Sequence, residues 1–257
     1  MRICGIWAWR RDAEIKMSAP AEPRLCYEDI AGMIEHPVLR PELSEEEVHT
    51  GCEIARHYRI AAVTVRPSDA DLAVNWMRGS GVAVASVVSY PHGSSTTSVK
   101  LYETRDLLRR GVTEIDTVIN IGKMITRQFQ YVEMELQQMA QACHEGGAIL
   151  KVAFENGYLT EDLKTIACKI VKRAEADYAR TSTPFGPSPY SLEDVALMKR
   201  LLGDKAKIKA SGGVRTIGDV LELRDAGCAR VGTIATVGIL EDWKARLAAQ
   251  NSQARTT

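Results

Sequence analysis

The sequence predicts a single (β/α)8 TIM barrel, an α/β fold, with a short helix over about 27–33 before the first strand. Apolar strand-like runs alternate with helical patterns along the chain, and they are continuously apolar, as strands buried on both faces are. No glycine-rich dinucleotide turn follows the first run, which disfavours the alternative, a doubly wound open sheet. The expected strands are 34–39, 60–65, 82–89, 114–121, 149–155, 177–181, 207–210 and 230–233.

Helix boundaries between these runs carry recognisable signals. Ser44 and Glu47 form a capping box that opens a helix through Tyr58. Further helices are expected to begin at hydroxyl residues and to end at glycines, with starts at Thr160, Ser191 and Thr216 and ends at Gly203 and Gly227.

The chain has 257 residues, which suits one large α/β domain. No low-complexity linker divides it, so we expect one barrel over residues 23–248. Residues 1–22 are expected to be an ill-ordered N-terminal extension, and residues 249–257 a polar C-terminal tail.

Composition narrows the classes of partner. The 33 basic and 33 acidic side chains give zero net charge, so we expect neither a nucleic acid nor a membrane as a partner. The six cysteines are widely spaced and match no zinc motif, which predicts reduced thiols in a cytoplasmic protein without a metal. A small-molecule ligand fits this composition.

Charged residues inside the predicted strands are the strongest functional signal. The active site of such a barrel lies at the carboxyl ends of its strands. Charges there need partners, because an isolated buried charge is costly. The residues in question include Glu35, Asp116, Lys151, Glu155, Arg180 and Lys209. Lys209 beside Arg180 would have a lowered pKa and a nucleophilic amine; a purely structural ion-pair network is the alternative.

A candidate anion site follows the last two strands. Gly212 and Gly213, with Arg215, precede a predicted helix, and glycines at that place let backbone N–H groups approach an anion. Gly232 and Thr233 after the eighth strand, and Thr181 and Ser182 after the sixth, are candidates for the same site. Loops after strands 7 and 8 are the usual phosphate cradle of this fold.

Five segments resemble deoxyribose-phosphate aldolase, and the similarity extends over about residues 27–242. They are YPHGSSTT at 90–97, EIDTVINIG at 114–122, LKVAFE at 150–155, ADYARTST at 176–183 and KASGGVRT at 209–216. The resemblance implies a class I aldolase that cleaves 2-deoxyribose 5-phosphate to acetaldehyde and glyceraldehyde 3-phosphate, through a lysine Schiff base and without a metal or other cofactor.

The resemblance also implies roles for individual residues. A strand-7 lysine that lowers a neighbour's pKa matches Lys209, and a strand-4 proton-relay aspartate matches Asp116. The Schiff-base lysine of strand 6 falls on Arg180, whose guanidinium stays protonated and cannot attack a carbonyl. Pro184, Ile234 and Ala235 replace a glycine and small hydroxyl residues around the phosphate, which predicts a weakened phosphate site.

Three readings follow from these residues. In the first, a carbon–carbon lyase acts on deoxyribose 5-phosphate or a related aldol, Lys209 is the nucleophile, Arg180 depresses its pKa and Asp116 relays protons, with Lys151 and Glu155 in support. The second is an aldolase-inactive barrel that binds a small anionic metabolite. The third is a non-covalent lyase or isomerase using Asp116 and Glu155. A homo-oligomer is compatible with all three.

Overall fold

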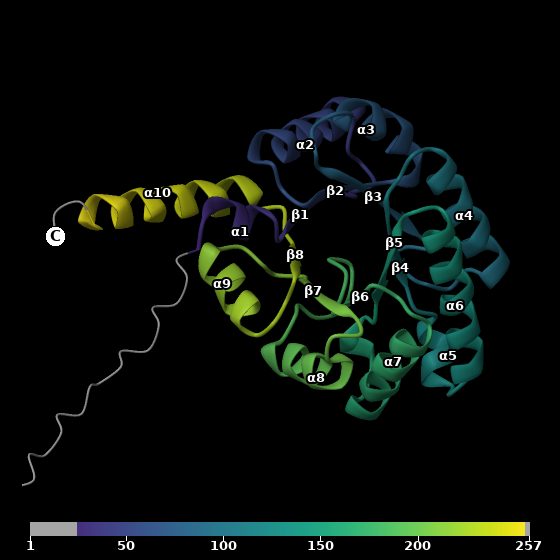
Figure 1. Ribbon diagram of the computed structural model, residues 1–257. Coiled ribbons are helices and arrows are strands. Elements are labelled where there is room, and N and C mark those ends of the chain that lie inside the picture. Colours follow the sequence, from purple (N-terminus) through teal and green to yellow (C-terminus); the bar gives the residue numbers. More distant parts are fainter. Residues whose placement is uncertain (1–24, 255–257) are drawn as a thin grey trace, which may run out of the picture.

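A closed barrel of eight parallel strands forms the centre of the protein, as the sequence predicts (Figure 1). The computed structural model describes residues 25–254, so the expectation for residues 1–22 lies outside the described residues. The strands are β1 (Ile34–Val38), β2 (Ala62–Val65), β3 (Ala83–Val88), β4 (Glu114–Val118), β5 (Ile149–Ala153), β6 (Tyr178–Arg180), β7 (Lys207–Ser211) and β8 (Arg230–Gly232).

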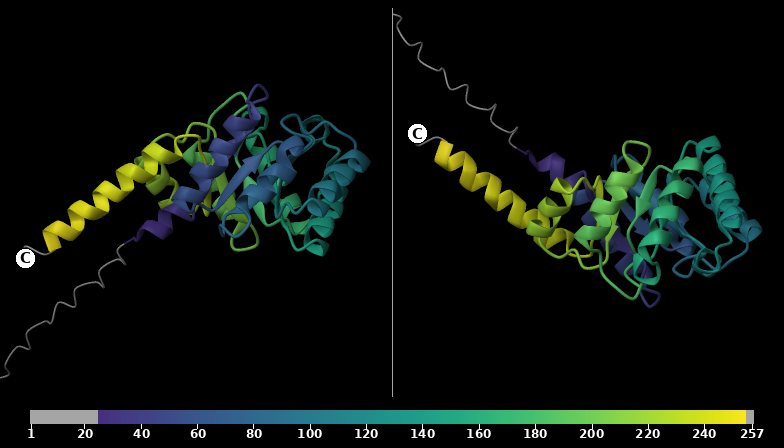
Figure 2. Two further views of the ribbon diagram at one scale, coloured as in Figure 1. Left: turned by 90° about the horizontal axis from the view of Figure 1, so that it is seen from above. Right: turned by 90° about the horizontal axis from the view of Figure 1, so that it is seen from below.

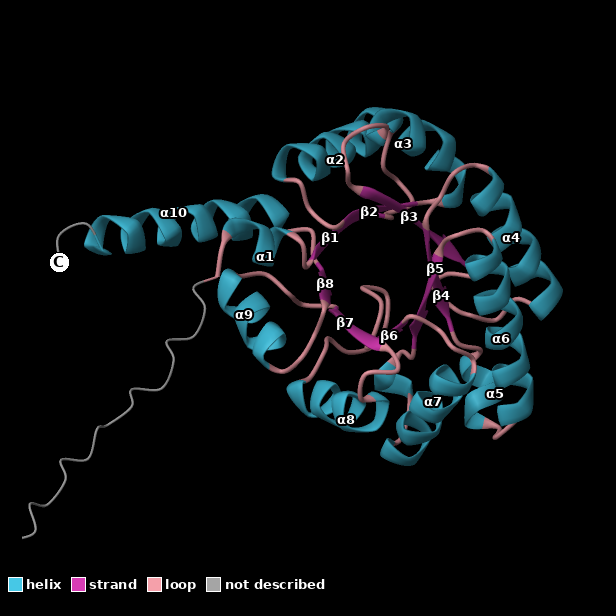
Figure 3. Cartoon of the chain, in the orientation of Figure 1, coloured by secondary structure: helices cyan, strands magenta, loops and turns pink. Residues whose placement is uncertain are grey.

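Helices form a ring around the outside of the strands (Figure 3). They are α1 (Tyr27–Ala31), α2 (Glu45–Tyr58), α3 (Ala70–Met77), α4 (Thr97–Arg109), α5 (Ile121–Ile125), α6 (Phe129–Glu145), α7 (Glu161–Arg173), α8 (Leu192–Leu202), α9 (Ile217–Asp225) and α10 (Thr236–Ala254). Short 3₁₀ turns occupy Pro67–Asp69 and Asn156–Tyr158. The expected helix over about 27–33 is therefore α1, which ends two residues earlier at Ala31.

Side-chain caps start the helices where the sequence predicts. The Ser44 hydroxyl accepts a hydrogen bond from the Glu47 N–H while the Glu47 carboxylate accepts from the Ser44 N–H, so the capping box is complete. The hydroxyls of Thr160, Ser191 and Thr216 likewise accept from the third residue of α7, α8 and α9. These caps satisfy orphan N–H groups and fix where each helix leaves the barrel.

Helix α10 differs from the others because its far end points away from the barrel (Figure 2). Its first half is held by Trp243, which is buried and whose indole N–H donates to the Cys26 carbonyl at 3.1 Å. The helix continues to Ala254, so residues 249–254 of the expected polar tail belong to it. Among the described residues, no helix has the length and apolar character needed to span a membrane.

The strand register brings the charged residues together. Asp116 of β4 lies opposite Lys151 of β5, and Arg180 of β6 lies opposite Lys209 of β7. Partners in a parallel register point to the same face, and these side chains are buried inside the barrel. Barrel closure then pairs β8 with β1 and adds Glu35 to the group.

Candidate active site

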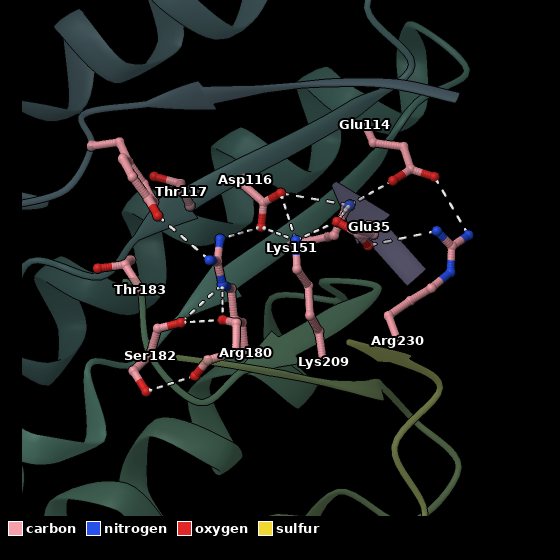
Figure 4. A network of polar contacts seen from close by, with 12 residues as sticks. Glu35, Glu114, Asp116, Thr117, Lys151, Arg180, Ser182, Thr183, Lys209 and Arg230 are labelled. Atoms are coloured by element: carbon pink, nitrogen blue, oxygen red, sulfur yellow. Dashed lines mark hydrogen bonds and ion pairs between the residues drawn. The ribbon is translucent and has the colours of Figure 1, made fainter. Parts of the chain in front are cut away.

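A network of ion pairs lies inside the barrel (Figure 4). Three of its members, Glu35, Arg180 and Lys209, also line a cavity. The network joins three carboxylates to four cations, and its members are Glu35, Glu114, Asp116, Lys151, Arg180, Lys209 and Arg230. We call these seven residues the barrel cluster. Six of them lie almost wholly out of solvent, and only Arg230 is partly exposed.

Lys209 lies at the centre of the barrel cluster. Its ammonium nitrogen is 3.2 Å from Asp116 Oδ1 and 3.1 Å from Asp116 Oδ2, and it also donates to Glu35 Oε2. Unlike Lys151, Lys209 is one of the residues that line the cavity. The Lys209 amine is thus the one lysine of the cluster placed where a substrate can reach it.

Lys151 is held by carboxylates alone. Its nitrogen is 2.5 Å from Glu114 Oε2, 2.8 Å from Glu35 Oε2 and 3.5 Å from Asp116 Oδ2. Burial by itself would lower the pKa of Lys151, but the three carboxylates outweigh it and raise this pKa above its usual range. Lys151 therefore stays charged and serves as the fixed counter-ion of the cluster.

Arg180 is anchored at each of its three nitrogens. Its Nε donates to the Ser182 carbonyl at 2.9 Å and to Ser211 Oγ at 2.7 Å. One terminal nitrogen lies 3.2 Å from Asp116 Oδ1, and the other lies 3.4 Å from the Tyr90 hydroxyl. Asp116 Oδ1 therefore accepts from both Arg180 and Lys209, and it holds the two cations on neighbouring strands.

The balance of charge makes Lys209 the cation that can lose its proton. Lys151, Arg180 and Arg230 already balance the three carboxylates, so Lys209 is the surplus positive charge. Burial lowers the pKa of Lys209 to about 8; Asp116 and Glu35 oppose this shift, and Lys151 and Arg180 add to it. An amine with this pKa is partly neutral near physiological pH, which nucleophilic attack requires.

The carboxylates remain ionised under the same conditions. Burial would raise the pKa of Asp116, but Lys151, Lys209 and Arg180 together hold it well below its usual value. The pKa of Glu35 is lowered in the same way, because Lys151 and Lys209 overcome the effect of burial. Asp116 is therefore a base that accepts a proton only when charge in the cluster changes.

The sequence alone indicates Glu35 as a charged residue of the site, but it does not indicate Glu114, Arg230 or Tyr90. Glu35 contacts both lysines, Glu114 and Arg230 extend the network, and Tyr90 contacts Arg180. Glu114 stands at the start of β4, away from the carboxyl end where the sequence places the site. Tyr90 lies in a loop after β3, where no periodic pattern indicates the direction of a side chain.

Glu155 lies apart from the barrel cluster. Its Oε1 accepts the Thr183 N–H at 2.6 Å, and its buried Oε2 lies against Gly186, where an added Cβ would clash with it. Burial raises the pKa of Glu155. This carboxyl group packs under the β6–α8 loop and fixes it, whereas Asp116 faces the lysines.

The cavity above Lys209 has a volume of about 320 Å³. Arg180, Ser211 and Glu35 join Lys209 at its base. Five of the predicted anion-binding residues line it, namely Gly212, Gly213, Arg215, Gly232 and Thr233. Gly212 and Gly213 have φ of 88° and 98°, a conformation that favours glycine and that turns the chain across the cavity.

The two remaining anion-site candidates make hydrogen bonds between strands. Thr181 Oγ1 accepts the Ser211 N–H at 3.2 Å, and the Ser182 hydroxyl donates to the Ser211 carbonyl at 3.2 Å. Thr181 and Ser182 are buried and are not among the residues that line the cavity. Within residues 25–254, no group of three or more His, Cys, Asp or Glu side chains is arranged to hold a metal ion.

Comparison with known proteins gives the same family as the motifs. The chain is 39% identical over 220 residues to the deoxyribose-phosphate aldolase of Bacteroides thetaiotaomicron, covering 86% of this chain and 92% of the relative. It is 39% identical over 217 residues to that of Caldanaerobacter subterraneus, covering 84% of this chain and 94% of the relative. No family model matches the chain.

Solved structures share the barrel. The aldolase QR15 superposes with a TM-score of 0.81 at 32% identity, covering 86% of this chain and 98% of its own. A tetrameric deoxyribose phosphate aldolase from Aeropyrum pernix superposes with a TM-score of 0.79 at 27% identity, covering 85% and 92%. With relatives this similar over most of both chains, the protein belongs to the deoxyribose-phosphate aldolase family.

Proposed function

We propose that this protein is a class I aldolase in which Lys209 forms the Schiff base. It cleaves 2-deoxyribose 5-phosphate or a related aldol to acetaldehyde and a second aldehyde. The observation that carries this proposal is the surplus positive charge at Lys209, at the base of a cavity, with a pKa lowered to about 8. The relatives' activity as deoxyribose-phosphate aldolases supports the reaction class.

The cluster supplies the groups that this reaction needs. The neutral Lys209 amine attacks the carbonyl carbon of the aldol, and loss of water gives a protonated imine, which is a cation again. Asp116, 3.1 Å from the amine nitrogen, stabilises that cation and relays protons to and from the substrate oxygen through water. Cleavage of the carbon–carbon bond leaves an enamine on Lys209, and protonation and hydrolysis release acetaldehyde.

The family resemblance implies a Schiff-base lysine at the position of Arg180. We assign Arg180 a different role. Its guanidinium remains protonated and cannot become the nucleophile. Its positive charge stays beside Asp116 Oδ1, and this charge lowers the pKa of Lys209 and so favours the neutral amine. The proposed enzyme thus exchanges the roles of the two strand-end cations.

Three further features support the class of substrate, a homo-oligomer and a cytoplasmic location. The partner is a small aldehyde or sugar, since the cavity of about 320 Å³ suits a molecule of that size. The tetrameric Aeropyrum relative supports a homo-oligomer. The five cysteines within the described part of the chain are free thiols, which supports a cytoplasmic location.

Imine trapping tests the proposal. Purified protein is incubated with acetaldehyde and sodium borohydride, and peptide mass spectrometry locates the ethyl adduct. We expect one adduct, on Lys209, and none in Lys209→Met. Adduct formation that persists in Lys209→Met would assign the nucleophile to another lysine, with Lys151 as the first candidate.

A parallel assay measures acetaldehyde released from 2-deoxyribose 5-phosphate. The absence of both trapping and release in the wild-type protein would overturn the proposal and favour a barrel that binds a small anion without aldolase chemistry. Release without trapping would instead favour non-covalent acid–base chemistry through Asp116 and Glu155. The two readouts therefore separate the three readings.

A further inference from the structure

We propose that the aldehyde half of the substrate is unphosphorylated and carries an apolar tail. This inference rests on the proposed function, because it concerns what extends from the Lys209 imine into the same cavity. The base of the cavity is charged, and apolar side chains form most of the rest of its lining, together with Arg40 and Arg215. The cavity therefore favours a substrate that is polar at its reacting end and apolar at the other.

The apolar wall comes from the end of β1 and from the loops that follow β1, β6, β7 and β8. Its members are Pro37, Leu39, Pro184, Phe185, Val214 and Ile234. Two large apolar side chains of this lining are exposed to solvent, Phe185 by 45% and Ile234 by 74%. A tail that covers both side chains removes apolar surface from water, which favours binding.

The position of Phe185 is fixed by its neighbours. Its ring packs edge-on against Tyr90, with centroids 5.9 Å apart, and the Tyr90 hydroxyl contacts Arg180. The N–H of Phe185 donates to Thr183 Oγ1 at 3.2 Å. This side of the wall is therefore tied to the barrel cluster and is formed before substrate binds.

The two hydroxyl groups beside Ile234, those of Thr233 and Thr236, already have partners within the protein. The Thr233 hydroxyl donates to the Val214 carbonyl at 2.7 Å and accepts the Ala235 N–H at 2.9 Å. The Thr236 hydroxyl lies 2.9 Å from His36 Nδ1. A phosphate needs several free donors, and this turn offers the cavity the Ile234 side chain in their place.

The start of α9 is also occupied by an anion of the protein itself. The Asp219 carboxylate accepts the N–H groups of Arg215 and Thr216, both at 2.8 Å. A second anion at this helix start would meet that negative charge. The Arg40 guanidinium, which also lines the cavity, is paired with Glu42.

The reaction balances without any further reactant. Lys209 condenses with the carbonyl of a 3-hydroxyaldehyde and releases water. The bond between C2 and C3 then breaks, the C3 hydroxyl loses its proton and leaves as an apolar aldehyde, and C2 keeps the electron pair as an enamine. Protonation of that carbon and addition of water release acetaldehyde and restore the amine.

A homologous series of substrates tests the inference. Acetaldehyde release is measured from 3-hydroxybutanal, 3-hydroxyhexanal, 3-hydroxyoctanal and 2-deoxyribose 5-phosphate. We expect kcat/KM to rise by about fourfold for each methylene added, as burial of a methylene in an apolar site implies. We also expect 3-hydroxyoctanal to exceed deoxyribose 5-phosphate, and inorganic phosphate not to compete with it.

Matched variants connect the effect to the wall. Ile234→Ser is expected to flatten the dependence on chain length. Val237→Ser serves as the control, because Val237 is 41% exposed on α10 but is not among the residues that line the cavity. It is expected to leave the dependence unchanged.

The outcomes separate this inference from the proposed function. Suppose that Lys209 is trapped as an imine. A higher kcat/KM for deoxyribose 5-phosphate, or competition by inorganic phosphate, would then overturn the proposal of an apolar tail and leave the proposed function standing. Equal kcat/KM across the hydroxyaldehydes does the same. No trapping, and no release from any of the four compounds, overturns both proposals.

Discussion

Two buried lysines, Lys100 and Lys209, contrast a structural ion pair with the proposed nucleophile. Lys100 on α4 is fully buried, and its nitrogen lies 2.6 Å from Glu135 Oε1 on α6 and 2.9 Å from the Val118 carbonyl. Lys209 is 1% exposed and also bonds to carboxylates. Burial lowers the pKa of both amines.

The difference lies in what surrounds each pair. Lys100 has one carboxylate partner that balances its charge, and it packs between two helices outside the barrel. Lys209 shares its carboxylates with Lys151 and Arg180, and it lines a cavity. Both lysines are buried, so burial does not distinguish them; what sets Lys209 apart is the excess of neighbouring cations and its place in the lining of the cavity.

The largest expected effect is that Lys209→Met loses activity but keeps its stability, whereas Lys100→Met loses stability but keeps its activity when folded. We expect Lys209→Met to abolish imine trapping and aldol cleavage while changing the free energy of unfolding by less than about 1 kcal/mol, because the remaining charges of the cluster balance. Lys100→Met leaves the buried Glu135 carboxylate without its cationic partner and should lower the free energy of unfolding by about 3–5 kcal/mol. Denaturant unfolding and trapping by the folded fraction measure the two effects.

The two substitutions are chemically identical, so each is the control for the other. Equal destabilisation by both would mean that Lys209 is as much a structural residue as Lys100. Loss of trapping in folded Lys100→Met protein would mean that the distinction between the two lysines is wrong.

The next effect concerns the cation beside Lys209. Arg180→Lys places a second amine opposite Lys209, at the position where the family resemblance implies the Schiff-base lysine. We expect cleavage of deoxyribose 5-phosphate to rise above wild type by about tenfold or more, which corresponds to 1.4 kcal/mol of barrier. Steady-state acetaldehyde release measures it, and an adduct on the new lysine would show where the chemistry has moved.

A smaller effect is expected on the pH dependence. The reactive form of Lys209 is the neutral amine, so kcat/KM should fall as the pH drops below about 8 and level off above it. Arg180→Met removes a cation that favours the neutral form. The pKa of Lys209 should then rise, and the descending limb should move to higher pH by about one unit. An unchanged pH dependence of kcat/KM in Arg180→Met would exclude Arg180 as a cause of the low pKa of Lys209.

The smallest effect is expected at Glu155, which is buried like the two lysines but holds a loop. Glu155→Gln keeps an oxygen that accepts the Thr183 N–H, so kcat/KM should stay within about threefold of wild type. Glu155→Ala is the companion variant, and it should lower activity more because the loop loses that acceptor. A loss of several orders of magnitude in Glu155→Gln would instead support acid–base chemistry through Glu155.

The fold could be predicted from patterns within short segments of the sequence. Continuous apolar runs, the capping box at Ser44 and the caps at Thr160, Ser191 and Thr216 are properties of short segments, and each appears in the structure where the sequence predicts it. The opposition of Arg180 and Lys209 followed from two neighbouring parallel strands with a cation at each end. Periodicity and capping act over a few residues, so one sequence suffices to recognise them.

The composition of the barrel cluster was decided by tertiary structure. Glu35 and Lys209 are 174 residues apart, and only closure of the barrel between β1 and β8 brings their side chains into contact. Glu155 is expected at the end of the fifth strand, but β5 ends at Ala153, the backbone of Glu155 turns at φ of 54°, and its carboxyl group contacts Thr183 instead of the lysines. No local pattern encodes that turn.

The sequence by itself therefore determined the eight βα units, the helix starts and the family to which they belong. The tertiary structure decided which carboxylates surround Lys209, which of the hydroxyl residues face the cavity, and that apolar side chains form much of its lining. The physical reason is that pKa values and pocket chemistry depend on charges and surfaces from distant segments, which only the closed barrel brings within a few ångströms of one another.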